Sequence, residues 1–470
     1  MVVPYIAVCP TCGSRIYLRI QDGSYINSYP IRINCGKCKT LIRGVYSMYG
    51  TERGISLENA VLRDAVPNAE TLELSAEYVC EVSGELISKP IQVFQGKIGD
   101  LSPFMRASQR MSGTILQNWI IRLKQFKSDF ERWWKEYYTA FQLLQDRSLT
   151  YIPEVMRNRM DGYEYPLNNE LKILHALHYV FLDSVQNLFF PRRIESIIAQ
   201  IHFYFEELPA DKLEAFIDAH EKEIDFLSCY TKLMDVFMAF MRIYPNLIPA
   251  EASLRYRDIN SDDGISTCTF SDIKSFYFDT YESVLSLIQI PVSIDNIIKR
   301  HDYFEFGNTA IKNKVGEDKN NRLHEYIGLD KGFKLKRIAS DEPFQGLLDF
   351  PKDNRLRNGI GHNNLYYDGE RQIIQLLNKA KQGEVVHSIS LLDMARECLA
   401  YVRASVVISE LILFLMRYKE RRGNGRSAMT PGLYPRNIGP NDRCPCGSGL
   451  KYKRCCKTDV ESMRNKQVKA

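Results

Sequence analysis

Eight of the twelve cysteines in this 470-residue chain lie in two groups near its ends. The first group reads Cys-x2-Cys, 22 intervening residues and Cys-x2-Cys, and the second reads Cys-x-Cys-x8-Cys-Cys. Paired thiolates suit tetrahedral zinc, and metal binding is the usual way in which so short a segment becomes structured. We therefore predict two structural zinc sites, one at Cys9, Cys12, Cys35 and Cys38 and one at Cys444, Cys446, Cys455 and Cys456.

The first cysteine group is typical of a zinc ribbon over residues 1–50. Each pair lies in a turn that contains Gly or Pro, and residues 15–20 and 31–34 alternate in the manner of strands. Two disulfides would fit poorly with a cytoplasmic chain, and a redox role is disfavoured because neither pair opens a helix. The four remaining cysteines are scattered, and we expect Cys229 and Cys398 to be buried hydrophobic residues.

The second cysteine group, residues 441–456, resembles the SEC-C motif, the zinc knuckle at the C-terminus of the translocase ATPase SecA and an appendage on many bacterial proteins. Arg443 and Leu450 depart from the motif's usual residues at positions that hold no metal. The resemblance concerns this segment alone. It implies a knuckle over residues 437–460 that binds zinc and docks a protein partner.

The basic charge of the chain is concentrated around this knuckle. Residues 417–470 hold 14 Lys or Arg against 4 Asp or Glu, whereas the whole chain has a net charge of +5. Such a tail attracts nucleic acid, an acidic protein surface or a membrane surface. The alternative is a tail that serves only solubility.

A third candidate site lies in residues 353–364, where Arg, Asn, Gly and His are closely spaced. Cleavage of RNA without metal needs a base for the 2′-hydroxyl proton and a cation for the phosphorane. Histidine titrates near neutral pH, and arginine clamps phosphate with two hydrogen bonds. His362 and Arg357 supply these groups, and Asn358 adds a hydrogen bond to the phosphate or orients the histidine. The alternative is that Arg357 and His362 only complete a helix end and a loop.

Arg357, Asn358 and His362 within a helical region resemble the motif of the HEPN superfamily, whose domains are common in bacterial defence and toxin systems. The resemblance implies a metal-independent ribonuclease with a site assembled between two copies of the motif, hence a homodimer. Some members of the superfamily only bind. The enzymatic assignment therefore rests on the motif and its helical setting.

Apolar periodicity predicts helices that would position these residues. We expect a hairpin that turns at Asp368–Gly369 after the candidate site. His175 and His178 lack a third ligand and are expected to be core or rim residues. Breaks are expected at Pro166, Pro191, Pro209 and Pro245. The predicted helices cover residues 114–144, 167–190, 192–207, 210–244, 271–290, 293–306, 344–361 and 389–420.

The predicted fold class is mainly α and multidomain, with helical bundles flanked by an N-terminal β zinc ribbon and a C-terminal zinc knuckle. The expected domains are the ribbon at 1–50, a mixed connector at 51–110, a helical domain at 111–250, a HEPN-like domain at 265–422 and the knuckle at 437–460. P-loop, dinucleotide-binding, G-x-S-x-G and H-E-x-x-H motifs are absent from the sequence.

We expect a cytoplasmic protein without a membrane span, because the start lacks a signal-peptide pattern and the apolar stretch at 406–416 is short. The leading hypothesis is a zinc-binding ribonuclease of an anti-phage or toxin system, whose zinc modules recruit RNA or a protein partner. The alternatives are an adaptor without catalysis and a nucleic-acid-binding protein.

Overall fold

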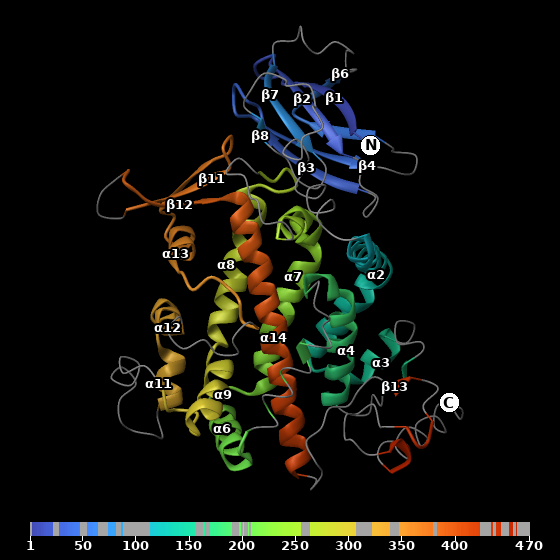
Figure 1. Ribbon diagram of the computed structural model, residues 1–470, viewed down its shortest axis with the longest axis vertical. Helices are drawn as coiled ribbons and strands as arrows, with labels where there is room; N and C mark the ends of the chain where they lie inside the picture. Colours follow the sequence, from blue (N-terminus) through green and yellow to red (C-terminus); the bar gives the residue numbers. More distant parts are fainter. Residues whose placement is uncertain are drawn as a thin grey trace. The chain divides into compact units, whose positions relative to one another are not determined.

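The structure is a computed structural model, and Figure 1 shows its helices and strands. The described residues are 2–21, 28–47, 54–63, 74–80, 86–87, 113–156, 163–164, 170–189, 197–198, 201, 205, 208–254, 264–306, 322–338, 347–378, 383–423, 434–435, 439–442, 451–454 and 457.

The chain divides into two compact units, and neither is continuous in sequence. Unit 1 comprises Met1–Lys124, Ala239–Glu282 and Phe350–Val402, and unit 2 comprises Gln125–Met238, Ser283–Asp349 and Arg403–Ala470. The predicted domain boundaries stay a prediction.

Unit 1 begins with two hairpins at the N-terminus (Figure 1). Each hairpin carries one cysteine pair in its turn. Strands β1 (Val2–Val8) and β2 (Arg15–Gln21) are antiparallel, and so are β3 (Ser28–Asn34) and β4 (Leu41–Ser47). Alternation of apolar and polar residues buries one face of each hairpin. The buried side chains include Ile16, Leu18, Ile20, Ile31, Ile33 and Ile42.

The segment expected to be a mixed connector adds strands to both N-terminal sheets. β5 (Gly54–Glu58) pairs with β4, and β6 (Val61–Arg63) pairs with β1. β7 (Leu74–Cys80) lies parallel to β2, and β8 (Leu86–Ile87) pairs with β7. The β region therefore continues past residue 50.

The rest of unit 1 brings together parts of long helices, a short helix and a small sheet. Helix α8 (Phe270–Ser286) and helix α14 (Leu391–Gly423) contribute to both units, as do α2 (Gly113–Gln145) and α7 (Phe226–Ser253). Helix α13 (Arg355–Gly361) precedes the three-stranded antiparallel sheet of β10 (Leu365–Asp368), β11 (Ile373–Leu377) and β12 (Val385–Ser390). The predicted hairpin is present, with a turn at residues 369–372.

Unit 2 is built from helices around a buried apolar core. Its remaining elements are α4 (Glu170–Ser184), α6 (Ala210–Glu223), α9 (Gln289–Arg300), α11 (Arg322–Gly328) and α12 (Lys331–Ile338), with the short helices η3 (Leu149–Tyr151), α3 (Ile152–Val155), η4 (Gln186–Phe189) and η5 (Tyr452–Arg454). Strand β9 (Tyr163–Glu164) pairs with β13 (Tyr434–Pro435). The chain is thus mostly helical with a small N-terminal β region that carries a cysteine cluster, which confirms the predicted fold class.

Helix α7 differs from the prediction at both ends. The predicted break at Pro245 is wrong, because α7 runs through Pro245 and Pro249 to Ser253. Leu247, Ile248 and Ala250 are buried, and Glu251 accepts a hydrogen bond from Trp119 Nε1 at 3.1 Å, so tertiary contacts keep this stretch helical. The unpredicted break before α7 has a local cause, since the Asp225 carboxylate accepts from the Ser228 amide at 2.9 Å.

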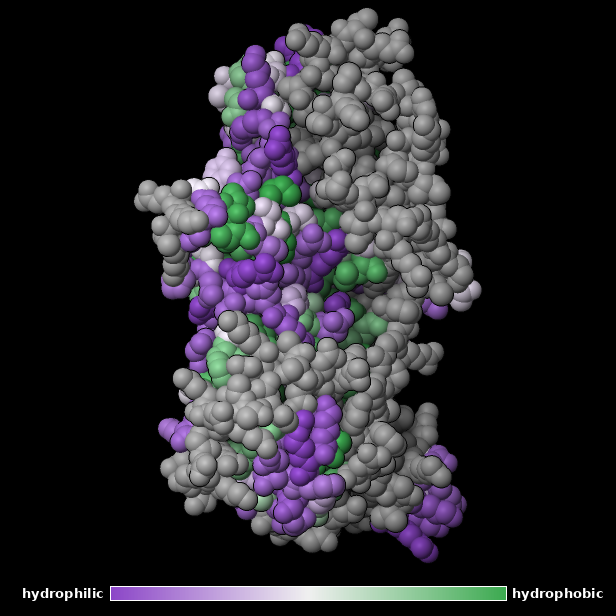
Figure 2. Space-filling view, turned by 60° about the vertical axis from the view of Figure 1, so that its left-hand side comes forward, coloured by the Kyte–Doolittle hydropathy of each residue, from purple (hydrophilic) through white to green (hydrophobic). Residues whose placement is uncertain are grey.

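Helix α14 is long and apolar enough to cross a membrane, so the expectation that its apolar stretch is too short is wrong. However, its most apolar stretch of 18 residues is 94% buried inside the structure. Burial of this kind is typical of the core helix of a soluble protein. On the face shown in Figure 2, hydrophobic residues form small groups among hydrophilic ones.

Candidate functional site

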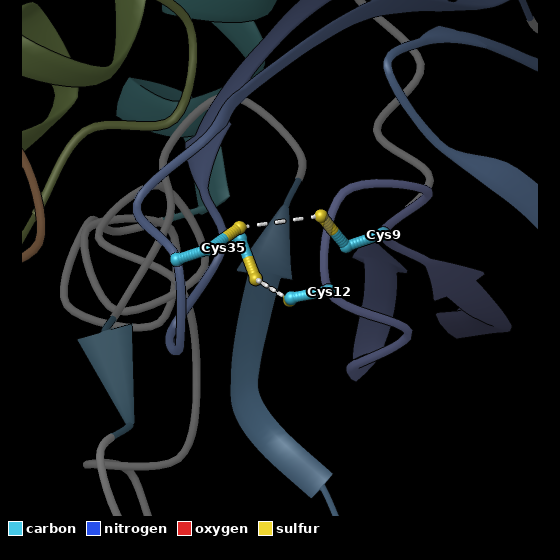
Figure 3. A group of neighbouring side chains, drawn as sticks. Cys9, Cys12 and Cys35 are labelled. Atoms are coloured by element: carbon cyan, nitrogen blue, oxygen red, sulfur yellow. Dashed lines mark hydrogen bonds between the residues drawn. The ribbon is translucent and has the colours of Figure 1, made fainter.

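The four N-terminal cysteines come together at the tips of the two hairpins. The Cys9 and Cys38 sulfurs are 3.5 Å apart, the Cys12 and Cys35 sulfurs are 3.6 Å apart, and all four lie within 4.8 Å of one another. Figure 3 shows Cys9 and Cys12 on one turn facing Cys35 on the other. Tetrahedral zinc with Zn–S bonds of about 2.3 Å requires sulfurs about 3.8 Å apart, whereas a disulfide brings them to about 2.05 Å. The geometry fits a metal and does not fit two disulfides.

The two cysteine turns share one backbone design. The Cys9 amide donates to Ser14 O at 2.9 Å and the Gly13 amide to Cys9 O at 2.8 Å, while Cys35 and Lys39 repeat this pattern at 2.9 and 3.0 Å. Gly13 and Lys39 both have left-handed backbone, with φ of 68° and 63°. Glycine takes this conformation without strain, so a local signal exists for Gly13 but none for Lys39.

Neighbouring hydroxyl groups favour the thiolate form of the two more exposed cysteines. The Thr40 hydroxyl, 3.1 Å from the Cys38 sulfur, lowers the pKa of that thiol to about 6. The Ser14 hydroxyl lowers the pKa of Cys12 in the same way. Burial raises the pKa of Cys35 to about 11. A bound metal would favour the thiolate of all four cysteines.

The residues Arg357, Asn358 and His362 lie at one end of helix α13 in unit 1. Arg357 and Asn358 are on the helix, and His362 follows its last residue. The end is fixed by Asn363, which has left-handed backbone with φ of 54°, and by the Asn364 amide, which donates to Gly359 O at 2.9 Å. The predicted helix stop near Gly361 is therefore present.

Two glycines let helix α13 approach its neighbours closely. A Cβ atom on Gly359 would lie 2.7 Å from Leu376 Cδ2 of strand β11, and one on Gly361 would lie 3.1 Å from Phe278 Cε2 of helix α8. Contacts this short leave no room for a side chain at Gly359. The two glycines therefore allow α13 to pack closely against β11 and α8.

The Arg357 guanidinium is held in one orientation. Its Nε donates to Glu282 Oε1 at 2.6 Å, its Nη1 donates to Asn358 Oδ1 at 3.2 Å, and it lies 5.1 Å above the centre of the Phe278 ring. A guanidinium has five N–H donors, and three of these have no partner among the described residues. Sequence reasoning missed Glu282 and Phe278, which carry no local signal because they lie about 75 positions earlier.

The three predicted residues differ in their hydrogen bonds and exposure. Arg357 and Asn358 are joined directly, whereas the His362 side chain is exposed and makes no hydrogen bond or ion pair within the described residues. An exposed imidazole is accessible to substrate. The catalytic roles of the three residues stay a prediction.

A second cluster of polar side chains lies inside unit 2 and is fully buried. His178 Nδ1 is 2.8 Å from the Tyr230 hydroxyl, and His178 Nε2 is 2.9 Å from Glu410 Oε2. Arg417 lies 3.3 Å from Glu410 Oε1 and 2.6 Å from His175 Nε2. His175, His178, Glu410 and Arg417 are each at most 3% exposed. The expected core role of the two histidines agrees with this burial.

The segment of the C-terminal knuckle is described only in part. Its cysteines, Cys444, Cys446, Cys455 and Cys456, lie outside the described residues. Within those residues, the Tyr452 amide donates to Asp442 O at 2.8 Å and the Lys453 amide to Pro440 O at 3.0 Å. Tyr452 is buried. These bonds join the two halves of the motif.

Comparison with known proteins finds similarity in this C-terminal segment. The model of the SEC-C motif family matches residues 441–457. The chain is 55% identical over 38 residues to the protein translocase subunit SecA of Thermodesulfovibrio yellowstonii, a match that covers 8% of this chain and 4% of that protein. It is 48% identical over 52 residues to SecA of Desulfovibrio desulfuricans, with 9% and 6% covered.

The similarity is limited to a short stretch, and the chain spans only a few per cent of the length of these SecA proteins. No solved structure matches the chain. A SEC-C motif and a cluster of four cysteines together indicate zinc binding.

Proposed function

We propose that this protein binds two zinc ions, one at Cys9, Cys12, Cys35 and Cys38 and one at the cysteines of the SEC-C motif. The observation that supports the first site is the approach of four sulfurs to within 4.8 Å. The match of residues 441–457 to the motif family supports the second. The second site would stabilise a segment too short to have its own apolar core, and the first would tie together the tips of two hairpins.

Zinc stoichiometry tests this part of the proposal. We expect two zinc ions per chain for the wild type, released on thiol modification and measured with a metallochromic dye. Cys38→Ser and Cys455→Ser should each remove one ion. Cys229→Ser, which changes a buried cysteine outside both groups, is the matched control and should keep two. One ion in the wild type would contradict the proposal.

We further propose that the helical part of the protein is a metal-independent ribonuclease of an anti-phage or toxin system, like the HEPN domains that its motif resembles. The observation that carries this proposal is that a fixed guanidinium and an exposed histidine both lie near the end of α13, five positions apart in sequence. The three remaining Arg357 donors would stabilise the phosphorane. His362 would take the 2′-hydroxyl proton as the oxygen attacks phosphorus and forms a cyclic phosphate, and the protonated His362 of the second copy in the proposed homodimer would supply a proton to the leaving 5′ oxygen.

Asn358 has one role in this proposal beyond those predicted. Its amide oxygen accepts from Arg357 Nη1, so it orients the arginine. Its two amide N–H donors remain for a phosphate oxygen.

One observation favours the alternative of an adaptor without catalysis. The Glu282 carboxylate pairs with Arg357 at 2.6 Å, and a negative charge at this position opposes the binding of phosphate. In the adaptor, Arg357 and Glu282 would only join α13 to α8. The zinc modules would then be the functional surfaces of the protein.

Cleavage of total RNA and tRNA in EDTA separates these two functions. EDTA suppresses contaminating metal-dependent nucleases, and the zinc content is measured after the reaction to ensure that both sites remain filled. We expect the wild type to cut RNA and His362→Ala to cut it about 10²-fold to 10⁴-fold more slowly. His324→Ala, a change at another exposed histidine, is the control. Cutting by His362→Ala at the wild-type rate would contradict the ribonuclease.

The partners and location complete the proposal. We propose RNA as the substrate, a protein or RNA partner at the C-terminal knuckle with its basic surroundings, a homodimer through the helical part, and a place in the cytoplasm. Steep salt dependence of RNA binding would support the role of the basic tail.

A further inference from the structure

The second cysteine turn of the ribbon contacts the turn between β10 and β11. Lys39 forms an ion pair with Glu370 of that turn. The Asn34 amide lies against Gly369, where a Cβ atom would be 3.0 Å from Asn34 Nδ2. The same Asn34 Nδ2 donates to Lys39 O at 2.9 Å across the cysteine turn. The contact is therefore made by the loop that carries Cys35 and Cys38.

The strand that leads into this loop contacts the residues before helix α8. The Arg32 amide donates to Ser266 O at 2.6 Å, and its Nε lies 3.6 Å from Asp272 Oδ2. Asp272 is also the residue whose carboxylate accepts from the Thr269 amide at 2.8 Å at the start of α8. The ribbon thus reaches two segments that are far apart in sequence.

These two segments form one surface, the platform, made of Ile265, Ser266, Gly369, Glu370 and Gln372. The Gln372 side chain joins them, because its Nε2 donates to Ile265 O and its Oε1 accepts from the Ile265 amide, both at 2.8 Å. Gln372 is buried and has left-handed backbone with φ of 54°. A non-glycine residue keeps this conformation only where its surroundings fix it.

The platform continues directly into the elements that hold the candidate RNA site. Strand β11 packs on helix α13 through Leu376 and Gly359. The Leu377 amide donates to Asn364 O at 3.0 Å, just after His362. On the other side, helix α8 begins at the platform and carries Phe278 and Glu282, which hold Arg357.

We propose that the N-terminal ribbon is an internal clamp whose metal keeps the candidate site in order. With metal on the four cysteines, the Cys35–Cys38 loop is fixed against Gly369 and Glu370, and the platform fixes α13. Without metal, the Cys35–Cys38 loop loses the bonds that tie it to Cys9 and Cys12 at the tip of the other hairpin, and its conformation is no longer fixed. The inference rests on the zinc site proposed above and does not depend on ribonuclease activity.

Hydrogen exchange followed by mass spectrometry tests the clamp on the full-length chain. Exchange is measured for the zinc-loaded wild type and after removal of zinc by a chelator, with the zinc content determined in parallel. We expect exchange of residues 355–377 to rise about tenfold without zinc, while residues 170–184 of unit 2 stay unchanged. Unchanged exchange at 355–377, with the ribbon itself exchanging faster, would overturn the clamp.

Because removal of zinc affects the whole ribbon, a second test keeps the metal in place. Glu370→Lys places two like charges at the contact, and Lys39→Glu with Glu370→Lys restores an opposite pair. We expect Glu370→Lys to speed exchange of residues 365–377 about threefold to fivefold, as the loss of an exposed pair allows, and the double variant to reverse this. Glu384→Lys changes a carboxylate that is bonded to Asn378 in the connection between β11 and β12, and it is the control. Equal exchange in the Glu370 and Glu384 variants would overturn the clamp.

Failure of the clamp can be told apart from failure of the zinc proposal and of the ribonuclease proposal. A chain that binds no zinc fails the first proposal by its stoichiometry. A chain that binds zinc and shows the same exchange at 355–377 with and without it fails the clamp alone. Absence of RNA cleavage leaves either exchange result interpretable.

Discussion

The buried cluster of unit 2 and the helix-end cluster of unit 1 use the same kinds of side chain for different purposes. Each contains an arginine paired with a glutamate, and each has a histidine nearby in space or sequence. In unit 2, both ring nitrogens of His178 are bonded, and His178, Glu410 and Arg417 are at most 3% exposed. In unit 1, Arg357 and Glu282 are 28% and 24% exposed, and His362 is at the surface.

The difference shows that burial and bonding, and not residue type, separate a structural cluster from a candidate site. A buried polar network with every member bonded fixes the packing of its helices. Its members are at most 3% exposed, so they are not accessible to a ligand from outside. The cluster on α13 keeps three arginine donors and a histidine for an outside group.

The largest expected effect comes from breaking the buried cluster. Glu410→Ala would leave the Arg417 charge in the core without its carboxylate, and His178 would lose one of its two partners. Removal of one member of a buried pair costs about 3–5 kcal/mol. We expect the free energy of unfolding in urea to fall by this amount. A change below about 1 kcal/mol would contradict the structural role that we assign to this cluster.

An intermediate effect is expected from His220 of helix α6, a third kind of histidine. It is buried, neither ring nitrogen has a partner in the described part of the chain, and its ring stacks on Phe226 at 4.7 Å. Burial lowers the pKa of His220 from 6.5 to about 4.

Because the folded pKa of His220 is the lower one, the unfolded chain takes up the proton first. Stability is therefore present above pH 6.5 and is lost as the pH falls from 6.5 towards 4, by roughly 3 kcal/mol in total. The difference in unfolding free energy between the wild type and His220→Leu, measured at pH 7.5 and pH 4.5, should change by most of this amount. An equal difference at both pH values would show that His220 does not titrate in this way.

The smallest effect on stability is expected at the exposed site. His362→Ala removes a side chain with no bond among the described residues, so the free energy of unfolding should stay within about 0.5 kcal/mol of the wild type. Thermal and urea unfolding measure this together with the cleavage assay. Marked destabilisation would show that His362, like His178, has a structural role.

The features that could be predicted from the sequence are those with a local pattern of residues. Apolar periodicity predicted α2 and α14 closely, and cysteine spacing predicted that Cys9, Cys12, Cys35 and Cys38 meet. The contacts that it missed join distant positions, such as Glu282 with Arg357. The continuation of α7 through Pro245 depends on tertiary packing around Glu251, which overrides the local preference of proline.

Helix α14 has a consequence for the synthesis of this protein. Its residues Glu410 and Arg417 bond to His178 and His175, which lie 232 and 242 positions earlier. At 5–20 residues per second, the ribosome needs about 10–50 s to reach α14 after α4 has been made. During this interval the apolar surfaces that α14 covers remain exposed, and contacts of such long separation also slow the closure of the core. The nascent chain is thus expected to depend on chaperones until its last long helix emerges.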